Sequence, residues 1–212
     1  MEINVTDIFC ILGKRGSGKS EIAKHFLRQM DKSEYPILIM DVNSEYSKNE
    51  FENAVIYKTK TLDDYFSGYD RKISAFIESN NSGMIVFEDA DVLISQSKLP
   101  MPIYDLIIRG RHKGMGCMFL FRRANNIHKQ LLYNSHHIFI PKTTLPNDVQ
   151  YLGEYIPGAD EIIPFLPKYE FFQYEFDTEE RHIVKLNLKT DTLEIMESWI
   201  TRNFCTNSQW KI

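Results

Sequence analysis

Cysteine is scarce in this sequence, and its three cysteines (Cys10, Cys117 and Cys205) are scattered along the chain. Two of them fall in segments predicted to be buried strands, so we expect reduced core thiols in an intracellular compartment rather than a disulfide framework. The sequence also lacks zinc-ligand spacing, internal repeats and low-complexity tracts. These absences argue against a structural zinc module, a solenoid and a disordered chain.

Long apolar runs are missing as well. No stretch approaches the roughly 20 apolar residues that a membrane-spanning helix needs. Residues 1–5 lead almost directly into the first predicted strand and show no signal-peptide pattern, so we expect a protein that is not secreted and has no transmembrane segment. With 212 residues, 43% of them hydrophobic and 25% charged, the chain suits one α/β domain with a short appendage.

Acidic residues are absent from residues 106–147, although the whole chain carries a net charge of −4. The negative total argues against an indiscriminate nucleic-acid binder. The local excess of positive charge indicates a surface that faces the phosphates of a nucleotide or a nucleic acid, and a solvated basic face without a partner is the alternative. The basic residues of this segment are Arg109, Arg111, Lys113, Arg122, Arg123, Lys129 and Lys142, with His112, His128, His136 and His137.

A complete phosphate-binding P-loop, or Walker A motif, stands near the N-terminus. The pattern G-x-x-x-x-G-K-[ST] is matched by Gly13, Lys14, Arg15, Gly16, Ser17, Gly18, Lys19 and Ser20. Residues 8–12 predict a buried parallel strand before the loop, and residues 21–30 predict a helix after it. Glycines let the backbone approach a polyphosphate, and the amides at the helix start attract it.

This context predicts a nucleoside triphosphate site rather than a surface turn that matches by chance. Lys19 can reach the β- and γ-phosphates, and the hydroxyl of Ser20 can bind Mg²⁺. Further along, Glu88 and Asp89 end a continuous apolar strand. In a P-loop protein, acids at this place hold Mg²⁺ and activate the attacking water, whereas a solvated strand end is the alternative.

The remaining pattern predicts an α/β fold with a mostly parallel central sheet, flanked by helices and ending in a β-hairpin. The hairpin is expected from residues 169–176 and 181–188, which alternate apolar and polar side chains. We predict a P-loop ATPase domain in residues 1–190 and a C-terminal tail in residues 191–212. Other predicted strands are 35–40, 55–57, 84–87, 117–121 and 138–140, and predicted helices are 62–78, 102–113, 126–133, 147–155 and 160–166.

The stretch from Arg111 to Arg123 resembles the FtsK–HerA superfamily of ring-forming, DNA-pumping ATPases, whose P-loop domain is RecA/FtsK-like. In that superfamily a helix ends in R-x-x-G, on which Arg111 and Gly114 fall. The strand that follows ends in a T-Q-R-type motif, on which residues 121–123 fall. Residues 41–46 also look like the superfamily loop D-x-x-G-E-Y. Order and spacing agree over residues 8–142, and the small size is most similar to genome-packaging ATPases of icosahedral viruses with an internal membrane, of the archaeal turreted type.

This resemblance implies an ATP-hydrolysing DNA translocase that uses Mg²⁺ and acts as a homo-oligomeric ring, a hexamer in the simplest case. Its expected partners are a double-stranded viral genome and capsid or membrane vertex proteins, in the host cytoplasm or at the virion vertex. The metal ligands would be Ser20 and Glu88, and Asp89 would activate water. Arg109 or Arg111 would act on the phosphate bound by a neighbouring subunit.

Two departures from the superfamily pattern affect the expected chemistry. Glu88-Asp89 replaces the usual Asp-Glu, which moves each carboxylate by one methylene, about 1.5 Å, and predicts slow turnover. Arg122 replaces a glutamine sensor at the strand end. An arginine cannot accept a hydrogen bond from the attacking water, although it can contact the γ-phosphate or DNA.

Two other functions stay open at this point. A small-molecule kinase, acting on a nucleoside or nucleotide, also begins with strand, P-loop and helix, but the R-x-x-G segment fits it poorly. A filamentous-phage assembly ATPase is related in its core, but it usually carries a membrane segment. DNA-stimulated hydrolysis by hexamer-sized particles would indicate the motor, and phosphate transfer by a monomer or dimer would indicate the kinase.

Overall fold

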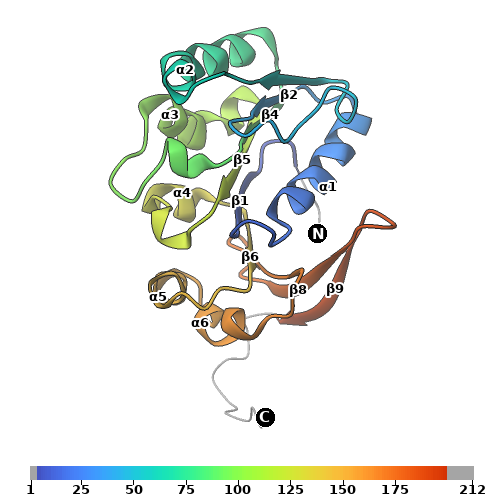
Figure 1. The fold of residues 1–212 in the computed structure, drawn as a ribbon, viewed down its shortest axis with the longest axis vertical. Coiled ribbons are helices and arrows are strands. Elements are labelled where there is room, and N and C mark those ends of the chain that lie inside the picture. The colour runs from blue at the N-terminus through green and yellow to red at the C-terminus, as the bar shows by residue number, and fades with distance from the viewer. Residues whose placement is uncertain (1–3, 200–212) are drawn as a thin grey trace.

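The frame of the molecule is one twisted sheet of nine strands in the order β3-β2-β4-β5-β1-β6-β7-β8-β9 (Figure 1). The computed structural model describes residues 4–199. Strands β1 to β6 pair in parallel and β7 to β9 pair antiparallel. The predicted α/β class, with a mostly parallel sheet and a C-terminal hairpin, is confirmed. The strands are β1 Ile8–Leu12, β2 Ile37–Met40, β3 Ala54–Tyr57, β4 Gly83–Phe87, β5 Met115–Phe121, β6 His137–Pro141, β7 Glu170–Glu175, β8 Arg181–Asn187 and β9 Thr192–Trp199.

Helices cover both faces of the sheet. Helix α1 (Lys19–Lys32) lies on one face, and α2 (Leu62–Ser79), α3 (Met101–Arg109) and α4 (Lys129–Asn134) lie on the other (Figure 1). The chain then adds α5 (Pro146–Tyr155) and α6 (Ala159–Ile162) before the antiparallel strands. Because α2, at 18 residues, is the longest helix and is amphipathic, no helix in the described part of the chain meets the requirements of a membrane span.

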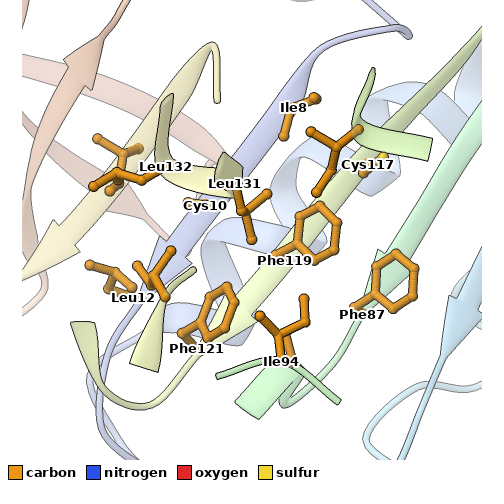
Figure 2. Close-up of a cluster of buried hydrophobic side chains, with 14 of the residues drawn as sticks. Ile8, Cys10, Leu12, Phe87, Ile94, Cys117, Phe119, Phe121, Leu131 and Leu132 are labelled. Carbon is orange, nitrogen blue, oxygen red and sulfur yellow. The ribbon is translucent and has the colours of Figure 1, made fainter. Parts of the chain in front are cut away.

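The central strands are buried on both sides, which explains their continuous apolar sequence. Successive side chains of β1 alternate between the two faces, so Phe9 and Ile11 pack toward α1 while their neighbours pack toward the opposite helices. Figure 2 shows the core on the opposite face, where β1, β4, β5, α4 and the segment after β4 meet, and its labelled side chains are Ile8, Cys10, Leu12, Phe87, Ile94, Cys117, Phe119, Phe121, Leu131 and Leu132. Tight packing here fixes the strand ends that carry the polar loops.

Two of the three cysteines belong to this core. Cys10 and Cys117 are fully buried and free, as the sequence predicts, and Cys205 lies outside the described residues. Burial raises the pKa of the Cys10 thiol to about 12, although a hydrogen bond with Ser135 opposes the shift. Both thiols therefore act as small apolar side chains.

The segment before β5 differs from its prediction as a single helix over residues 102–113. Helix α3 ends at Arg109, and a 3₁₀ turn, Arg111–Lys113, follows Gly110. A Cβ atom on Gly110 would lie 2.3 Å from the carbonyl oxygen of Leu106 and 2.8 Å from that of Met115. The chain therefore passes so close to its own backbone that only glycine fits, and the helix ends there.

The predicted tail also contributes to the sheet. Residues 192–199 form β9, which pairs with β8 and extends the predicted hairpin to three strands. The rest of the predicted tail, residues 200–212, lies outside the described residues. Whether residues 1–190 act as the ATPase domain stays a prediction.

Candidate active site

The P-loop stands at the carboxyl edge of the sheet, directly after β1. Gly16 and Gly18 have φ angles of 78° and 93°, in the left-handed region that other residues avoid. The amide of Ser17 donates to the carbonyl of Lys14 at 3.1 Å, which closes the turn, and α1 begins at Lys19. The first amides of this helix have no carbonyl before them to bond, so they are available to an anion.

A cavity of about 680 Å³ opens over this loop. It lies where α/β sheets place their ligands, outside the carboxyl ends of the strands. Its lining brings together residues from the P-loop, the loop after β2, the end of β4 and the end of β5. These lining residues are Lys14, Arg15, Gly16, Gly18, Lys19, Ser20, Glu21, Asn43, Glu45, Asp89 and Arg122.

Lys19 and Glu88 form a buried ion pair at the base of the cavity. The Lys19 ammonium lies 2.9 Å from Oε1 of Glu88 and 3.7 Å from Oδ1 of Asp89. The hydroxyl of Tyr46 donates to the other oxygen of Glu88 at 3.0 Å. Burial raises the pKa of the Glu88 carboxyl above its ordinary value, and the Lys19 charge opposes that shift. The two sequence-predicted residues therefore meet in space, 69 positions apart in the chain.

Asp89, the next residue, has different surroundings. Arg122 donates from Nε to Oδ1 of Asp89 at 2.9 Å and from Nη2 to Oδ2, and the side-chain amide of Asn43 also donates to Oδ2. Burial tends to raise the pKa of the Asp89 carboxyl, but the hydrogen bonds from Arg122 and Asn43 outweigh it and the pKa is lowered. Arg122 thus joins the second acid directly, a contact that the sequence analysis did not foresee.

Ser20 faces a carboxylate from the loop after β2. Its hydroxyl donates to Oε2 of Glu45 at 3.0 Å. Hydroxyl and carboxylate oxygens are the ligands that Mg²⁺ prefers, so Ser20, and Glu88 beside Lys19, are oxygen donors of the kind that fits this ion. Among residues 4–199, no three His, Cys, Asp or Glu side chains converge as a metal site.

No residue of the loop 41–46 was among the predicted site residues, yet the side chains of Asn43, Glu45 and Tyr46 all contact the site. Buried Asp41 fixes the loop by accepting the backbone amides of Glu45 and Tyr46, each at 3.0 Å. This turn places Glu45 beside Ser20, and it aims Tyr46 at Glu88. The sequence signals for this loop were its likeness to the superfamily loop D-x-x-G-E-Y and its polar composition after an apolar strand, and neither assigned a role to its members.

Arg109 and Arg111 lie at the opposite edge of the sheet. Both precede β5, whereas Arg122 follows it, so the seven residues of the strand separate them from the cavity by about 20 Å. Arg109 is 70% exposed and pairs with Asp105 at 3.3 Å. Arg111 is exposed, and no side-chain partner for it is found within residues 4–199. Neither arginine can reach the cavity of its own chain.

The basic segment of residues 106–147 therefore does not form one surface. Arg122, Arg123 and Lys142 follow strands β5 and β6 at the carboxyl edge, and Arg123 is bonded to buried Asp148 at 2.9 Å. Arg109, Arg111 and Lys113 lie at the amino edge. The strand between the two groups crosses the whole sheet.

Comparisons with known proteins agree with this architecture. Residues 3–102, which include the P-loop and both acids, match the family model "Helicase HerA, central domain". A search among curated proteins gives no match. A solved structure of the genome packaging NTPase B204 from Sulfolobus turreted icosahedral virus 2, in complex with ATP-gammaS, has a TM-score of 0.73 at 22% identity, over 92% of this chain and 98% of that one.

Two other solved structures show how far the likeness extends. One is a crystal structure of B204, the DNA-packaging ATPase from Sulfolobus turreted icosahedral virus. It has a TM-score of 0.75 at 20% identity, over 85% of this chain and 98% of that one. The pCW3 conjugation coupling protein TcpA, with ATPgS, has a TM-score of 0.54 at 14% identity, over 82% of this chain and 59% of that one. At these identities the likeness shows a shared fold.

Proposed function

We propose that this chain is an ATP-hydrolysing motor that moves double-stranded DNA. The proposal starts from the confirmed resemblance of the chain to the FtsK–HerA superfamily and to viral genome-packaging ATPases. The observation that carries this proposal is the meeting of Lys19, Glu88 and Asp89 under one cavity beside the P-loop. A motif that matched by chance would not place a strand-end acid pair against its lysine. The ATPase domain would comprise residues 1–190, and the segment that follows extends its sheet.

The residues divide the work of hydrolysis as follows. The P-loop amides and Lys19 hold the β- and γ-phosphates, because Lys19 can exchange its bond with Glu88 for one with phosphate. Asp89 stands at the cavity wall, where it would take the proton of the attacking water. Arg122 lines the same cavity and would contact the γ-phosphate. Ser20 and Glu88 would hold Mg²⁺, which supplies positive charge against the phosphate oxygens when bound.

The charge that develops on the transferring phosphate needs a further cation, and we assign it to a neighbouring subunit. Arg111 is the stronger of the two candidates, since Arg109 is already paired with Asp105. The exposed face of α3 beside them carries Met101, Tyr104 and Ile108, which are 71%, 38% and 44% exposed. Their spacing puts them on one helical stripe, the kind of apolar surface that a subunit contact covers. A hexamer-sized ring would be built through this face.

The proposed setting is genome packaging, in the host cytoplasm or at the virion vertex, with capsid or membrane vertex proteins as further partners. It follows from the resemblance to the turreted-virus packaging proteins, which share the size and the fold of this chain. The exposed cations Lys14 and Arg15 at the rim of the cavity are available to phosphate groups.

The test is ATP hydrolysis with and without duplex DNA, read beside the mass of the protein in solution. We expect hydrolysis that duplex DNA stimulates, from particles of ring size, and no hydrolysis from the Lys19→Ala control. ATP hydrolysis by a monomer at a rate that duplex DNA does not change would contradict the proposed motor function. Phosphate transfer to a nucleoside by a monomer or dimer would replace it with a kinase.

A further inference from the structure

An aromatic side chain stands against the P-loop without a role in the chemistry described above. Tyr169 directly precedes β7, whose residue Phe171 pairs with Pro141 of β6. A Cβ atom built on Gly18 would lie 3.3 Å from Cζ of Phe171 and 3.5 Å from Cδ1 of Tyr169, so both rings lie beside Gly18 at the start of α1. Phe171 is buried, whereas Tyr169 is 45% exposed.

The position of this ring is fixed by the backbone rather than by its hydroxyl. Tyr169 has a φ angle of 67°, a left-handed conformation that is costly for a bulky residue. Its hydroxyl makes no hydrogen bond with any residue in the 4–199 range. The Lys168 ammonium lies over one face of the ring, 4.6 Å from its centroid, and because Tyr169 is 45% exposed, a group from solvent can still reach the ring. Neither burial nor a polar contact explains why a tyrosine is held there.

The location of the phosphates determines what can meet this ring. With the β- and γ-phosphates on the P-loop and Lys19, the α-phosphate falls at the first turn of α1, beside Ser20 and Glu21. The sugar and base must leave the phosphates from this end. Gly18 caps the same turn, and the exposed ring rests on Gly18. A flat base leaving the first turn of α1 would therefore pass the exposed ring of Tyr169.

We propose that Tyr169 is the stacking platform for the nucleobase of the bound nucleoside triphosphate. This subsite, formed by Tyr169 beside Gly18, depends on the proposed nucleotide function and adds the base to it. An aromatic ring accepts the π-face of any base. The phosphates would then fix the ligand at one end and the ring at the other.

The experiment compares two probes that share phosphates and differ in the base. Binding of ATP-gammaS and of inorganic tripolyphosphate, each with Mg²⁺, is measured by calorimetry for the wild type and for Tyr169→Leu. We expect Tyr169→Leu to weaken the binding of ATP-gammaS about 5- to 100-fold, the range for one base stacked on an aromatic ring. The affinity for tripolyphosphate should stay unchanged. Tyr169→Phe should bind as the wild type does. Tyr35→Leu is the matched control, since Tyr35 is 38% exposed and also precedes a strand, but at the amino edge.

A spectroscopic variant reports the contact itself. In Tyr169→Trp, ATP-gammaS should quench the new indole emission and tripolyphosphate should not. Unchanged ATP-gammaS affinity in Tyr169→Leu, or equal weakening of both probes, would overturn the subsite, because the second result assigns the ring to the shape of the P-loop. If the wild type binds neither probe, the nucleotide site and the subsite fall together.

Discussion

Two adjacent carboxylates, Glu88 and Asp89, have such different surroundings that they can perform different tasks. Glu88 is buried between Lys19 and Tyr46, and burial raises its pKa. Asp89 lines the cavity and is held by Arg122 and Asn43, whose hydrogen bonds lower its pKa against the effect of burial. A buried acid next to the P-loop lysine is suited to binding a metal ion that sits against the phosphates. An acid on the cavity wall suits contact with water.

We therefore predict distinct losses in Glu88→Gln and Asp89→Asn. Glu88→Gln should weaken Mg²⁺-dependent ATP binding, because a metal ligand is lost. Asp89→Asn should bind ATP normally and lose roughly 10²- to 10⁴-fold in turnover, because a general base is lost. Binding with and without Mg²⁺, together with steady-state hydrolysis, separates the two. Exchanged phenotypes would mean that the roles of the two acids are reversed.

How far the site could be predicted depends on the sequence distance between its parts. The eight P-loop residues are local, so a motif sufficed to find them and their strand-loop-helix context. The contacts of Glu45 with Ser20 and of Tyr46 with Glu88 join residues 25 and 42 positions apart. They depend on a loop shape that Asp41 imposes through two backbone amides. No periodicity in the sequence encodes that turn.

At the scale of elements, the R-x-x-G segment does more than end a helix, because the backbone at Gly114 packs closely against the backbone before β4. Gly114 has a φ angle of 69°, and a Cβ atom there would lie 2.3 Å from the carbonyl oxygen of Asn81. Its carbonyl accepts the amide of Gly83 at the start of β4. This glycine therefore helps to set β4 and β5 in register. The register in turn fixes the position of Glu88 and Asp89, which follow β4, relative to Arg122, which follows β5.

We predict that Gly114→Ala lowers the free energy of unfolding by about 1–3 kcal/mol, through strain and collision with backbone that cannot move aside. Gly16→Ala is the control, because Gly16 also has a positive φ angle of 78° but no atom within 4 Å of its added Cβ. Thermal and denaturant unfolding measure both. Equal losses in the two variants would show that backbone strain alone, without the contact, sets the cost.

A second element-scale prediction concerns pH. Buried Asp7 joins the segment before β1 to β6, with Oδ2 3.2 Å from Nε2 of His137 and accepting the amide of Asn4 at 2.8 Å. Burial tends to raise the pKa of the Asp7 carboxyl, but the hydrogen bond with His137 and the amide of Asn4 lower it overall. A lowered pKa stabilises the fold above the ordinary value of 3.8, and this contribution is lost as pH falls through the folded pKa.

Unfolding of Asp7→Asn and wild type between about pH 6 and about pH 3 tests this sign. The wild type should be the more stable near neutral pH, and its advantage should shrink below about pH 4, as the carboxylate protonates. An advantage that grows toward low pH would contradict the direction of the shift.

The sequence predicted the central elements better than the edge. Strands β1, β4 and β5 are buried on both faces and read as unbroken apolar runs, whereas β9 has a strand neighbour on one side and carries Ile195 and Met196 at 54% and 50% exposure. A half-exposed edge strand needs no regular apolar alternation, so residues 192–199 resembled a loosely docked tail. The end of α3 was missed for a different reason, since it depends on the close approach of Gly110 to the carbonyl oxygens of Leu106 and Met115, which no apolar periodicity signals.

At the scale of the whole molecule, the proposed ring can be tested by mixing defective subunits. Arg111→Ala should bind ATP nearly as the wild type does and lose about 10³-fold or more in turnover. Mixing it with Lys19→Ala protein should restore part of the activity, because some interfaces then pair an intact P-loop with an intact arginine. Arg109→Ala should lose much less, since its side chain is already bound to Asp105.

Two results would remove the shared site from this account. One is an Arg111→Ala protein with normal turnover. The other is a mixture that stays inactive while both variants still assemble into particles of wild-type mass. If Arg109→Ala instead shows the large loss and the complementation, the donated arginine is the other one.

The placement of the P-loop at one edge of the sheet and of Arg111 at the other has a consequence for symmetry. Two subunits related by a two-fold axis could exchange arginines only if one interface contained both edges of each subunit, and such a contact would close at a dimer. A contact that joins the arginine edge of one subunit to the P-loop edge of the next, without the reciprocal contact, is heterologous, so it repeats in one sense until it closes into a ring or continues as a filament. In such an assembly every subunit points the same way around the axis. The directionality that a DNA motor requires would then be present in the arrangement of the protein before any DNA is bound.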